Sequence, residues 1–213
     1  MKISFLTGFF TGLLLSLVLM AALLGSRLAS GGRDAGNARD RNVPAQGPQT
    51  APITLLEFAD FHCPHSRQAM PVIRQLIERF PGKIRREFHH FPQSDPGQTG
   101  SYVTHQWAAC AHGQGKFWEF HDAVYALAQP PAPADLPRIA AAAGMNVDQL
   151  QACVKRGQYQ GFILRGRVLG TRKGVLGTPT FFINDHKVTG AASIGYLSDL
   201  IKDLLEGRKV NVP

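Results

Sequence analysis

The run of residues 61–66, FHCPHS, contains a cysteine in a setting that favours reactivity. Cys63 follows an apolar run typical of a strand and precedes Pro64, which a helix accepts at its first position because no N–H donor is needed there. A thiol at a helix start faces unpaired backbone N–H groups and the positive end of the helix dipole, and both stabilise a thiolate. A protonated His65 would add positive charge nearby. Because the thiolate is the nucleophile in thiol chemistry, the motif predicts a reactive Cys63 rather than a cysteine packed as a small hydrophobe.

A second motif, Gly-Thr-Pro-Thr at residues 177–180, stands directly before another apolar run typical of a strand. Proline is permitted where a strand begins, so the motif predicts a loop that enters the sheet. The bond between Thr178 and Pro179 can be trans or cis, and the sequence leaves that choice open.

The remaining chain supplies the elements that must hold these two motifs. Short apolar runs predict strands, and apolar residues at helical spacing predict helices. Strands are expected at 53–59, 83–91, 180–184 and 187–189, and helices at 69–80, within the block 98–176 and at 193–206. This order predicts an α/β fold, a small sheet with helices on both faces and a helical insertion at about 98–176.

The first 50 residues differ from this pattern. An apolar stretch between Lys2 and Arg27 is long enough to span a bilayer as a helix. We therefore expect residues 1–24 to be a transmembrane anchor or, alternatively, a signal segment. Residues 25–50 are rich in Gly, Ala, Arg, Asn and Pro, which is typical of a flexible linker. Residues 51–213 are then expected to form one folded domain.

The composition excludes several classes of protein. With 44% hydrophobic and 18% charged residues, the chain is neither disordered nor collagen-like nor a coiled coil. Three cysteines are too few for a disulfide-scaffolded miniprotein or a four-cysteine zinc module. The net charge of +8 is spread along the chain without a basic run, so we expect a mildly basic surface and no nucleic-acid partner.

Three segments together resemble the DsbA-like branch of the thioredoxin superfamily. Residues 55–65 (LLEFADFHCPH) are similar to the family's strand and active-site start, residues 114–122 (QGKFWEFHD) to a helical-insertion signature, and residues 177–183 (GTPTFFI) to its cis-proline loop. The resemblance covers most of residues 51–206 and implies a thioredoxin-like sheet. The resemblance is specific because three motifs occur in the order and at the spacing of the family.

The resemblance also implies roles for individual residues. Cys63 would be the attacking thiol, with His65 beside it in the motif. Thr178 and Pro179 would line the site and present backbone to an extended polypeptide substrate. Glu57 would be a buried acid beneath the site that relays a proton, unless it is a strand residue with a surface partner.

The chain departs from the family at Ser66, which stands where the second active-site cysteine is expected. In a dithiol site the second thiol resolves the mixed disulfide that the first has formed, and a serine hydroxyl cannot do so. Ser66 can still donate a hydrogen bond to the Cys63 thiolate. The sequence therefore predicts monothiol exchange, in which a thiol from elsewhere resolves the mixed disulfide, and net dithiol oxidation is not expected.

The other two cysteines, Cys110 and Cys153, both fall in the helical block. In an exported protein, two cysteines away from the active site suggest a structural disulfide. Two alternatives stay open: both are buried free thiols, or one of them resolves Cys63. We expect no cofactor. We also expect no metal site, because neighbouring histidines in a strand, such as His89 and His90, face opposite sides of the sheet.

These observations predict an enzyme of extracytoplasmic thiol–disulfide exchange that acts on protein substrates through Cys63. Expected partners are polypeptide thiols or disulfides, glutathione or a membrane redox partner, and the membrane itself through residues 3–24. The domain would lie in the periplasm or outside the cell, anchored in the inner membrane or secreted to the periplasm after signal cleavage. The alternatives are a non-catalytic binding or chaperone-like module and a glutathione-dependent transferase or isomerase.

Overall fold

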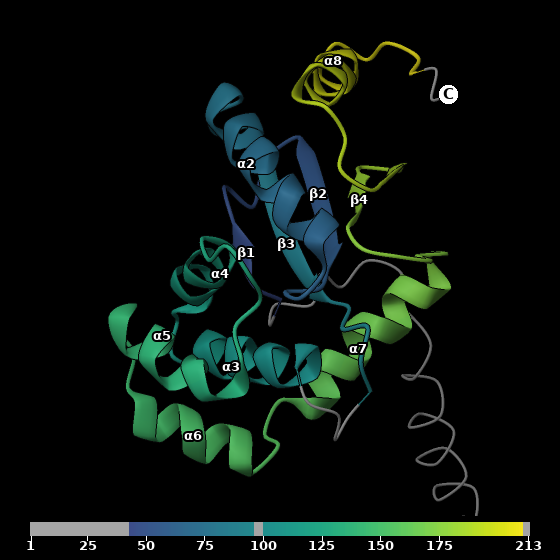
Figure 1. Cartoon of the computed structure of the whole chain (residues 1–213). Helices are drawn as coiled ribbons and strands as arrows, with labels where there is room; N and C mark the ends of the chain where they lie inside the picture. The colour runs from purple at the N-terminus through teal and green to yellow at the C-terminus, as the bar shows by residue number, and fades with distance from the viewer. Residues whose placement is uncertain (1–42, 96–99, 211–213) are drawn as a thin grey trace, which may run out of the picture. The chain divides into compact units, whose positions relative to one another are not determined.

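The computed structural model describes residues 43–95 and 100–210, which build one mixed sheet with helices on both faces (Figure 1). The transmembrane or signal helix predicted over 1–24, and most of the linker predicted over 25–50, lie outside the described residues. Within the described residues, no helix combines the length and the apolarity that crossing a membrane requires.

The described residues form a five-stranded sheet in the order β1-β3-β2-β4-β5. The strands are β1 (Ala45–Gln46), β2 (Ile53–Ala59), β3 (Ile84–His90), β4 (Thr180–Ile183) and β5 (His186–Thr189). β2 and β3 run parallel, whereas the other neighbours are antiparallel. β2 is central, with Glu57 opposite Phe88 of β3 and Phe181 of β4. The segment that follows β2 therefore leaves the middle of the sheet rather than its edge.

The folded unit starts earlier than the sequence predicts. The composition predicts a linker up to residue 50, whereas Val43 is already buried and β1 pairs with β3. The carbonyl oxygen of Pro44 accepts a hydrogen bond from the N–H of Phe88 at 2.9 Å. Because the edge of β3 would otherwise leave backbone groups unpaired, a segment with little apolar pattern joins the sheet through backbone hydrogen bonds. Because backbone hydrogen bonds do not depend on the side-chain type, the sequence pattern does not predict this strand.

Between β3 and β4 the chain forms a block of helices, within the segment where the sequence predicts an insertion. The block contains α3 (Ser101–Gly113), α4 (Phe117–Tyr125), a short 3-10 helix (Pro133–Asp135), α5 (Leu136–Ala142), α6 (Val147–Lys155) and α7 (Gln160–Arg172). In Figure 1, α3 to α6 gather at one end of the sheet and α7 leads from them toward β4. Two further helices are α2 (Pro64–Arg79), which follows β2, and α8 (Ile194–Leu205) at the C-terminal side.

Alternation along the strands divides the core between the two faces of the sheet. Leu55 and Phe181 belong to the main cluster, which also holds apolar residues of α2, α8 and the insertion. Phe58 and Phe182 belong to a smaller cluster, against which Leu169 of α7 packs. The predicted α/β sheet with helices on both faces is confirmed.

α7 lies close to the sheet because two of its residues are glycines. A Cβ added to Gly166 would lie 2.5 Å from the carbonyl oxygen of His90 in β3. A Cβ added to Gly170 would lie 2.6 Å from the ring of Phe91. Since non-bonded atoms do not approach that closely, a side chain at either position forces the helix away from the sheet.

Replacing Gly166 with alanine is expected to lower the free energy of unfolding by about 1–3 kcal/mol, because backbone atoms must move to admit the new methyl group. The matched control is Gly161→Ala in the same helix, whose new Cβ would meet only the flexible end of Arg165, at 3.8 Å. That control should be neutral or stabilising by up to about 1 kcal/mol, since alanine is the better helix former. Urea unfolding of the full chain measures both, and equal effects would contradict the close approach.

Candidate active site

Cys63 caps the N-terminus of α2, just after the turn that follows β2. Pro64 is the first residue of the helix, and Cys63 has extended backbone angles (φ −75°, ψ 123°). The Cys63 carbonyl accepts from the N–H of Arg67 at 3.1 Å, and the Cys63 N–H donates to the carbonyl of Asp60 at 3.0 Å. Its thiol is free and the residue is partly exposed. The thiol is thus held at the start of a helix, the position that the sequence predicts.

The loop before β4 lies against the same cysteine. The peptide bond between Thr178 and Pro179 is cis. The thiol of Cys63 donates a hydrogen bond to the carbonyl oxygen of Thr178 at 3.1 Å, although 115 residues separate the two in sequence. The side-chain hydroxyl of Thr178 is buried without a hydrogen-bond partner among the described residues. The structure therefore brings the two sequence motifs together at one site.

Ser66 and His65 are placed differently from one another. Ser66 is fully buried, and its hydroxyl oxygen accepts a long hydrogen bond (3.4 Å) from the N–H of Asp60. Among the described residues, no hydrogen bond joins Ser66 to Cys63, so the expected donation to the thiol is not made in this structure. His65 is exposed on the first turn of α2. Neither residue supplies a second sulfur.

Glu57 is fully buried in β2 beneath the site, and its partner is buried as well. One carboxylate oxygen, Oε2, accepts from Arg86 Nε at 2.7 Å and from Arg86 Nη2 at 2.6 Å. The other, Oε1, has no hydrogen-bond partner among the described residues. Of the two sequence hypotheses, the structure shows a buried acid and not a strand residue with a surface partner.

Arg86 connects this ion pair to the insertion. Its Nη2 lies 3.2 Å from Nε2 of His121, and its guanidinium stacks 4.7 Å from the ring centroid of Trp118. His121 Nδ1 lies 2.8 Å from a carboxylate oxygen of Asp122. Burial of the ring, together with the charge of Arg86, lowers the pKa of His121, although the hydrogen bond to Asp122 opposes the shift. The acid of β2 is therefore tied to α4.

Asp60 forms a second buried polar centre at the end of β2. Its carboxylate accepts from the N–H of His62 at 2.8 Å, from the N–H of Gln93 at 2.7 Å and from the hydroxyl of Ser101 at 2.7 Å. His105 Nε2 lies 3.6 Å from Asp60 Oδ1, which is too far for a normal hydrogen bond but close enough for an electrostatic interaction. Burial raises the pKa of Asp60, but His105 and the hydrogen bonds from His62 and Ser101 outweigh it and hold the pKa well below its ordinary value.

Two histidines continue this centre into the core. Nδ1 of His105 and Nδ1 of His90 are 2.8 Å apart, and both rings are buried. Burial, and then the nearby His105, lower the pKa of His90 well below its ordinary value. On the active-site side, Nε2 of His62 lies 2.9 Å from the hydroxyl of Thr104 in α3. Burial also lowers the pKa of His62, although Asp60 opposes the shift.

Arg67 fastens the active-site helix to the insertion. Its Nη1 donates to the carbonyl oxygens of Val124 and Leu127 at 3.0 and 2.7 Å, at the C-terminal end of α4. Its Nη2 donates to the carbonyl of Phe61 at 3.2 Å, just before the cysteine motif. One guanidinium therefore joins the turn, α2 and α4.

Sequence reasoning alone does not identify Asp60, Arg67, Arg86 or His105. Arg86 carries a signal, because it lies on the same face of β3 as two buried apolar residues, where a charge needs a buried partner. Asp60 carries a weaker one, as an acid that directly precedes the cysteine motif. Nothing in the sequence pairs either residue with a partner in the insertion.

Cys110 of α3 and Cys153 of α6 are joined in a disulfide, with their Cα atoms 6.1 Å apart. Of the alternatives that the sequence left open, neither two free thiols nor a thiol free to resolve Cys63 is present in this structure. Within residues 43–95 and 100–210, no three side chains of His, Cys, Asp or Glu converge as metal ligands.

Comparisons with known proteins give a family-model match and similar curated proteins. A protein-family model described as Thioredoxin matches residues 40–203. The chain is 33% identical over 153 residues to the Na(+)/H(+) antiporter NhaA 3 of Salinispora tropica, a match that covers 72% of this chain and 23% of that protein. The chain thus spans about a quarter of the length of the curated relatives it matches.

Solved structures show the same fold. A thioredoxin-like oxidoreductase from Silicibacter pomeroyi DSS-3 is 28% identical with a TM-score of 0.71, and the match covers 80% of this chain and 95% of that one. The thiol-disulfide exchange protein alpha-DsbA2 from Wolbachia pipientis is 24% identical with a TM-score of 0.69, covering 78% of this chain and 88% of that one. At that identity the second likeness concerns the fold alone.

Because of the buried histidines, we expect the free energy of unfolding to fall as the pH falls below about 6.5, the ordinary pKa of histidine. His90 and His121 have lowered pKa values in the folded chain, so the unfolded chain binds protons that the folded chain does not. The stabilisation is complete above the unfolded pKa and is lost as the pH falls toward the folded values, by up to about 1.4 kcal/mol per pH unit for each group. The lowered pKa of Asp60 adds a further loss below about pH 4.

Urea unfolding of the full chain between pH 8 and pH 4 measures this dependence. His90→Phe should flatten the slope below pH 6.5, whereas His65→Phe, on an exposed residue, should leave it unchanged. A His90→Phe chain with the slope of the unmodified protein would contradict the assignment.

Proposed function

Because the chain belongs to the thioredoxin family, we propose that it is a DsbA-like enzyme that exchanges disulfides of polypeptide substrates through the single thiol of Cys63. The observation that carries the proposal is the contact between the Cys63 thiol and the Thr178 carbonyl, in a motif whose fourth residue is Ser66. The chain has three cysteines, all in its described part, and the other two are joined to each other. One thiol therefore has to carry the whole exchange.

The reaction balances with one thiol and an outside partner. The Cys63 thiolate attacks one sulfur of a substrate disulfide, that S–S bond breaks, and the other substrate sulfur leaves as a thiolate. A thiol of the substrate then attacks the mixed disulfide, which frees Cys63 and leaves a rearranged substrate disulfide with no net transfer of electrons. Alternatively, the thiol of glutathione or of a membrane redox partner attacks the substrate sulfur of the mixed disulfide, which frees Cys63 and leaves the substrate joined to that partner by a disulfide. The Ser66 hydroxyl cannot perform this step, so the mixed disulfide lasts until a thiol of the substrate or of an outside partner attacks it.

Thr178 and Pro179 supply the surface on which we expect the substrate backbone to lie. The Thr178 carbonyl faces the thiol, and an extended chain along this loop would bring its sulfur to Cys63. Glu57 is our candidate for proton transfer beneath the site, and its unpartnered Oε1 is the oxygen available for the proton. His65, exposed beside Cys63, is our candidate for stabilising the leaving thiolate when it is protonated.

We also propose that the domain works outside the cytoplasm. A disulfide between Cys110 and Cys153 favours an oxidising compartment. Residues 3–24 would then serve as a membrane anchor or as a signal segment, with the domain in the periplasm or outside the cell. The antiporter activity in the name of the curated relative is not extended to this chain, which matches 23% of that protein.

Replacing Ser66 with cysteine tests the monothiol mechanism. In the unmodified chain, we expect a mixed disulfide to accumulate with a polypeptide whose one cysteine is linked by a disulfide to thionitrobenzoate, and no oxidation of a reduced dithiol polypeptide. Ser66→Cys should resolve that mixed disulfide within the motif and gain dithiol oxidation once its two cysteines are oxidised. The control Cys63→Ser should lose exchange in both backgrounds. Gel-based trapping of the complexes measures the outcome, and dithiol oxidation by the unmodified chain, or exchange by Cys63→Ser, would contradict the mechanism.

Leu176 offers a second test, of the polypeptide substrate. It lies two residues before Thr178 with 94% of its surface exposed, where it can pack against a chain lying along the loop. Leu176→Ser should slow exchange with an unfolded polypeptide by about tenfold, since burying such a side chain contributes about 1.5–3 kcal/mol. Exchange with oxidised glutathione should not change.

The matched control is Leu205→Ser at the end of α8, another exposed leucine, which should change neither rate. Equal losses with the polypeptide and with oxidised glutathione would show that Leu176 shapes the thiol site itself and does not contact substrate.

A further inference from the structure

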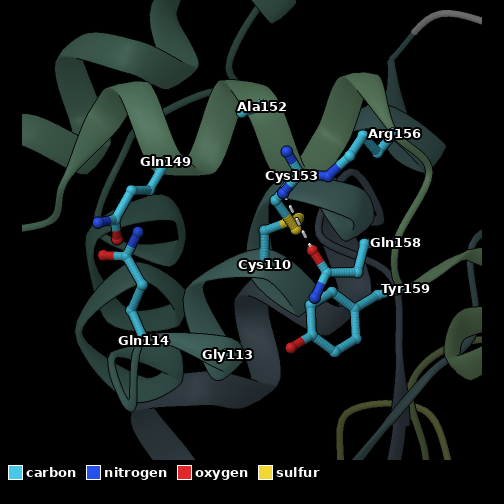
Figure 2. A pocket seen from close by; sticks show the side chains of 9 residues that line it. All are labelled: Cys110, Gly113, Gln114, Gln149, Ala152, Cys153, Arg156, Gln158 and Tyr159. Atoms are coloured by element: carbon cyan, nitrogen blue, oxygen red, sulfur yellow. Dashed lines mark hydrogen bonds between the residues drawn. A yellow bond between two sulfur atoms is a disulfide. The ribbon is translucent and has the colours of Figure 1, made fainter.

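The disulfide between Cys110 and Cys153 forms part of the wall of a pocket in the insertion (Figure 2). The pocket has a volume of about 290 Å³ and lies between the end of α3, α6 and the turn that leads to α7. Both cysteines are largely buried, and both are among the residues that line this pocket. The disulfide therefore both joins α3 to α6 and forms part of the pocket lining.

The wall of the pocket is polar and carries no carboxylate. Its side chains include the amides of Gln149 and Gln158, the phenol of Tyr159 and the guanidinium of Arg156. The Arg156 guanidinium makes one weak contact there, a donation to Gln158 Oε1 at 3.4 Å, drawn in Figure 2. A positive charge among neutral donors, with no acid to cancel it, fits a ligand that carries a carboxylate.

Several of these groups remain available to a ligand. Neither the Gln149 amide nor the Tyr159 hydroxyl makes a side-chain hydrogen bond to another described residue. Gln114 is different, because its amide is already occupied: it accepts from the N–H of Asn146 at 3.1 Å and donates to the Asn146 carbonyl at 3.0 Å. A Cβ at Gly113 would lie 2.4 Å from the Tyr159 hydroxyl, so the glycine makes room for the phenol at the pocket wall.

We propose that this pocket binds a small thiol that carries carboxylates, and that the bound thiol reduces the Cys110–Cys153 disulfide. The carboxylate would pair with Arg156, and polar groups of the ligand would bind the Gln149 amide and the Tyr159 hydroxyl. This arrangement holds the ligand against a wall that contains the S–S bond. The site uses neither Cys63 nor the cis-proline loop, so this proposal does not depend on the proposed exchange activity.

The electrons come from two ligand molecules. The thiolate of the first attacks one sulfur of the protein disulfide, the S–S bond breaks, a mixed disulfide forms, and the other sulfur leaves as a thiolate that takes a proton from water. A second ligand thiol attacks the ligand sulfur of the mixed disulfide. The products are the oxidised ligand and two protein thiols, and α3 is no longer joined covalently to α6.

The test uses the full chain with Cys63→Ser, so that the disulfide is the only cysteine chemistry present. Glutathione is the probe, and 2-mercaptoethanol at equal thiolate concentration is the neutral comparison. Alkylation of the released thiols followed by mass spectrometry gives the rates. We expect the glutathione rate to saturate with concentration and to exceed the 2-mercaptoethanol rate by about tenfold, which corresponds to one charge-assisted contact. S-methylglutathione, which has no thiol, should compete with glutathione.

Two variants separate binding from general exposure of the disulfide. Arg156→Gln should remove the tenfold advantage of glutathione, whereas Lys155→Gln, an exposed neighbour outside the pocket wall, should keep it. Rates that rise linearly and equally for both thiols, an Arg156→Gln chain with the full advantage, or thiols released only on unfolding would each overturn the proposal.

Discussion

The position of the thiol depends on one buried negative charge, the carboxylate of Asp60. An isolated carboxylate in the core is very costly, so Asp60 can stay ionised and buried only if several donors reach it together. Those donors come from the cysteine turn, from the loop after β3 and from the first residue of α3. The chain segments that carry them must therefore meet at one point, and that meeting fixes the turn that holds Cys63 at the start of α2.

The insertion is consequently part of the site. Besides Ser101, it contributes His105 next to Asp60, and His121 next to Arg86 and Glu57. In the other direction, Arg67 of α2 donates to backbone carbonyls at the end of α4. Buried polar groups of this kind are favourable only when each has its partners, so loosening the insertion would disturb the sheet as well. The cis-proline loop, which leads into β4 on the other side of β2, contacts the thiol of Cys63 through the Thr178 carbonyl.

The features that the sequence predicts correctly are those whose signals are local. Short apolar runs and helical spacing locate most strands and helices, and the Cys-Pro pair places the thiol at a helix start. β1 escapes prediction because it joins the sheet through backbone hydrogen bonds, which no side-chain pattern records. The partners of Asp60 and Glu57 escape it because they lie far along the chain, and pairing of buried charges is decided by the tertiary fold. Ser66 is recognisable as a departure from its family, but its bond to the Asp60 backbone has no signal in the sequence.

The central claim is that a single thiol carries the exchange, and the mass of the protein–substrate complex tests it most directly. The full chain would be mixed with a peptide whose one cysteine is linked by a disulfide to thionitrobenzoate, so that the leaving thiol departs from the peptide. Samples would be quenched with acid at successive times and measured by intact mass spectrometry and peptide mapping. The account predicts one peptide bound covalently at Cys63, persisting until a thiol is added, with Cys110 and Cys153 still joined to each other. A complex that disappears without added thiol, or a peptide bound at Cys110 or Cys153, would contradict it.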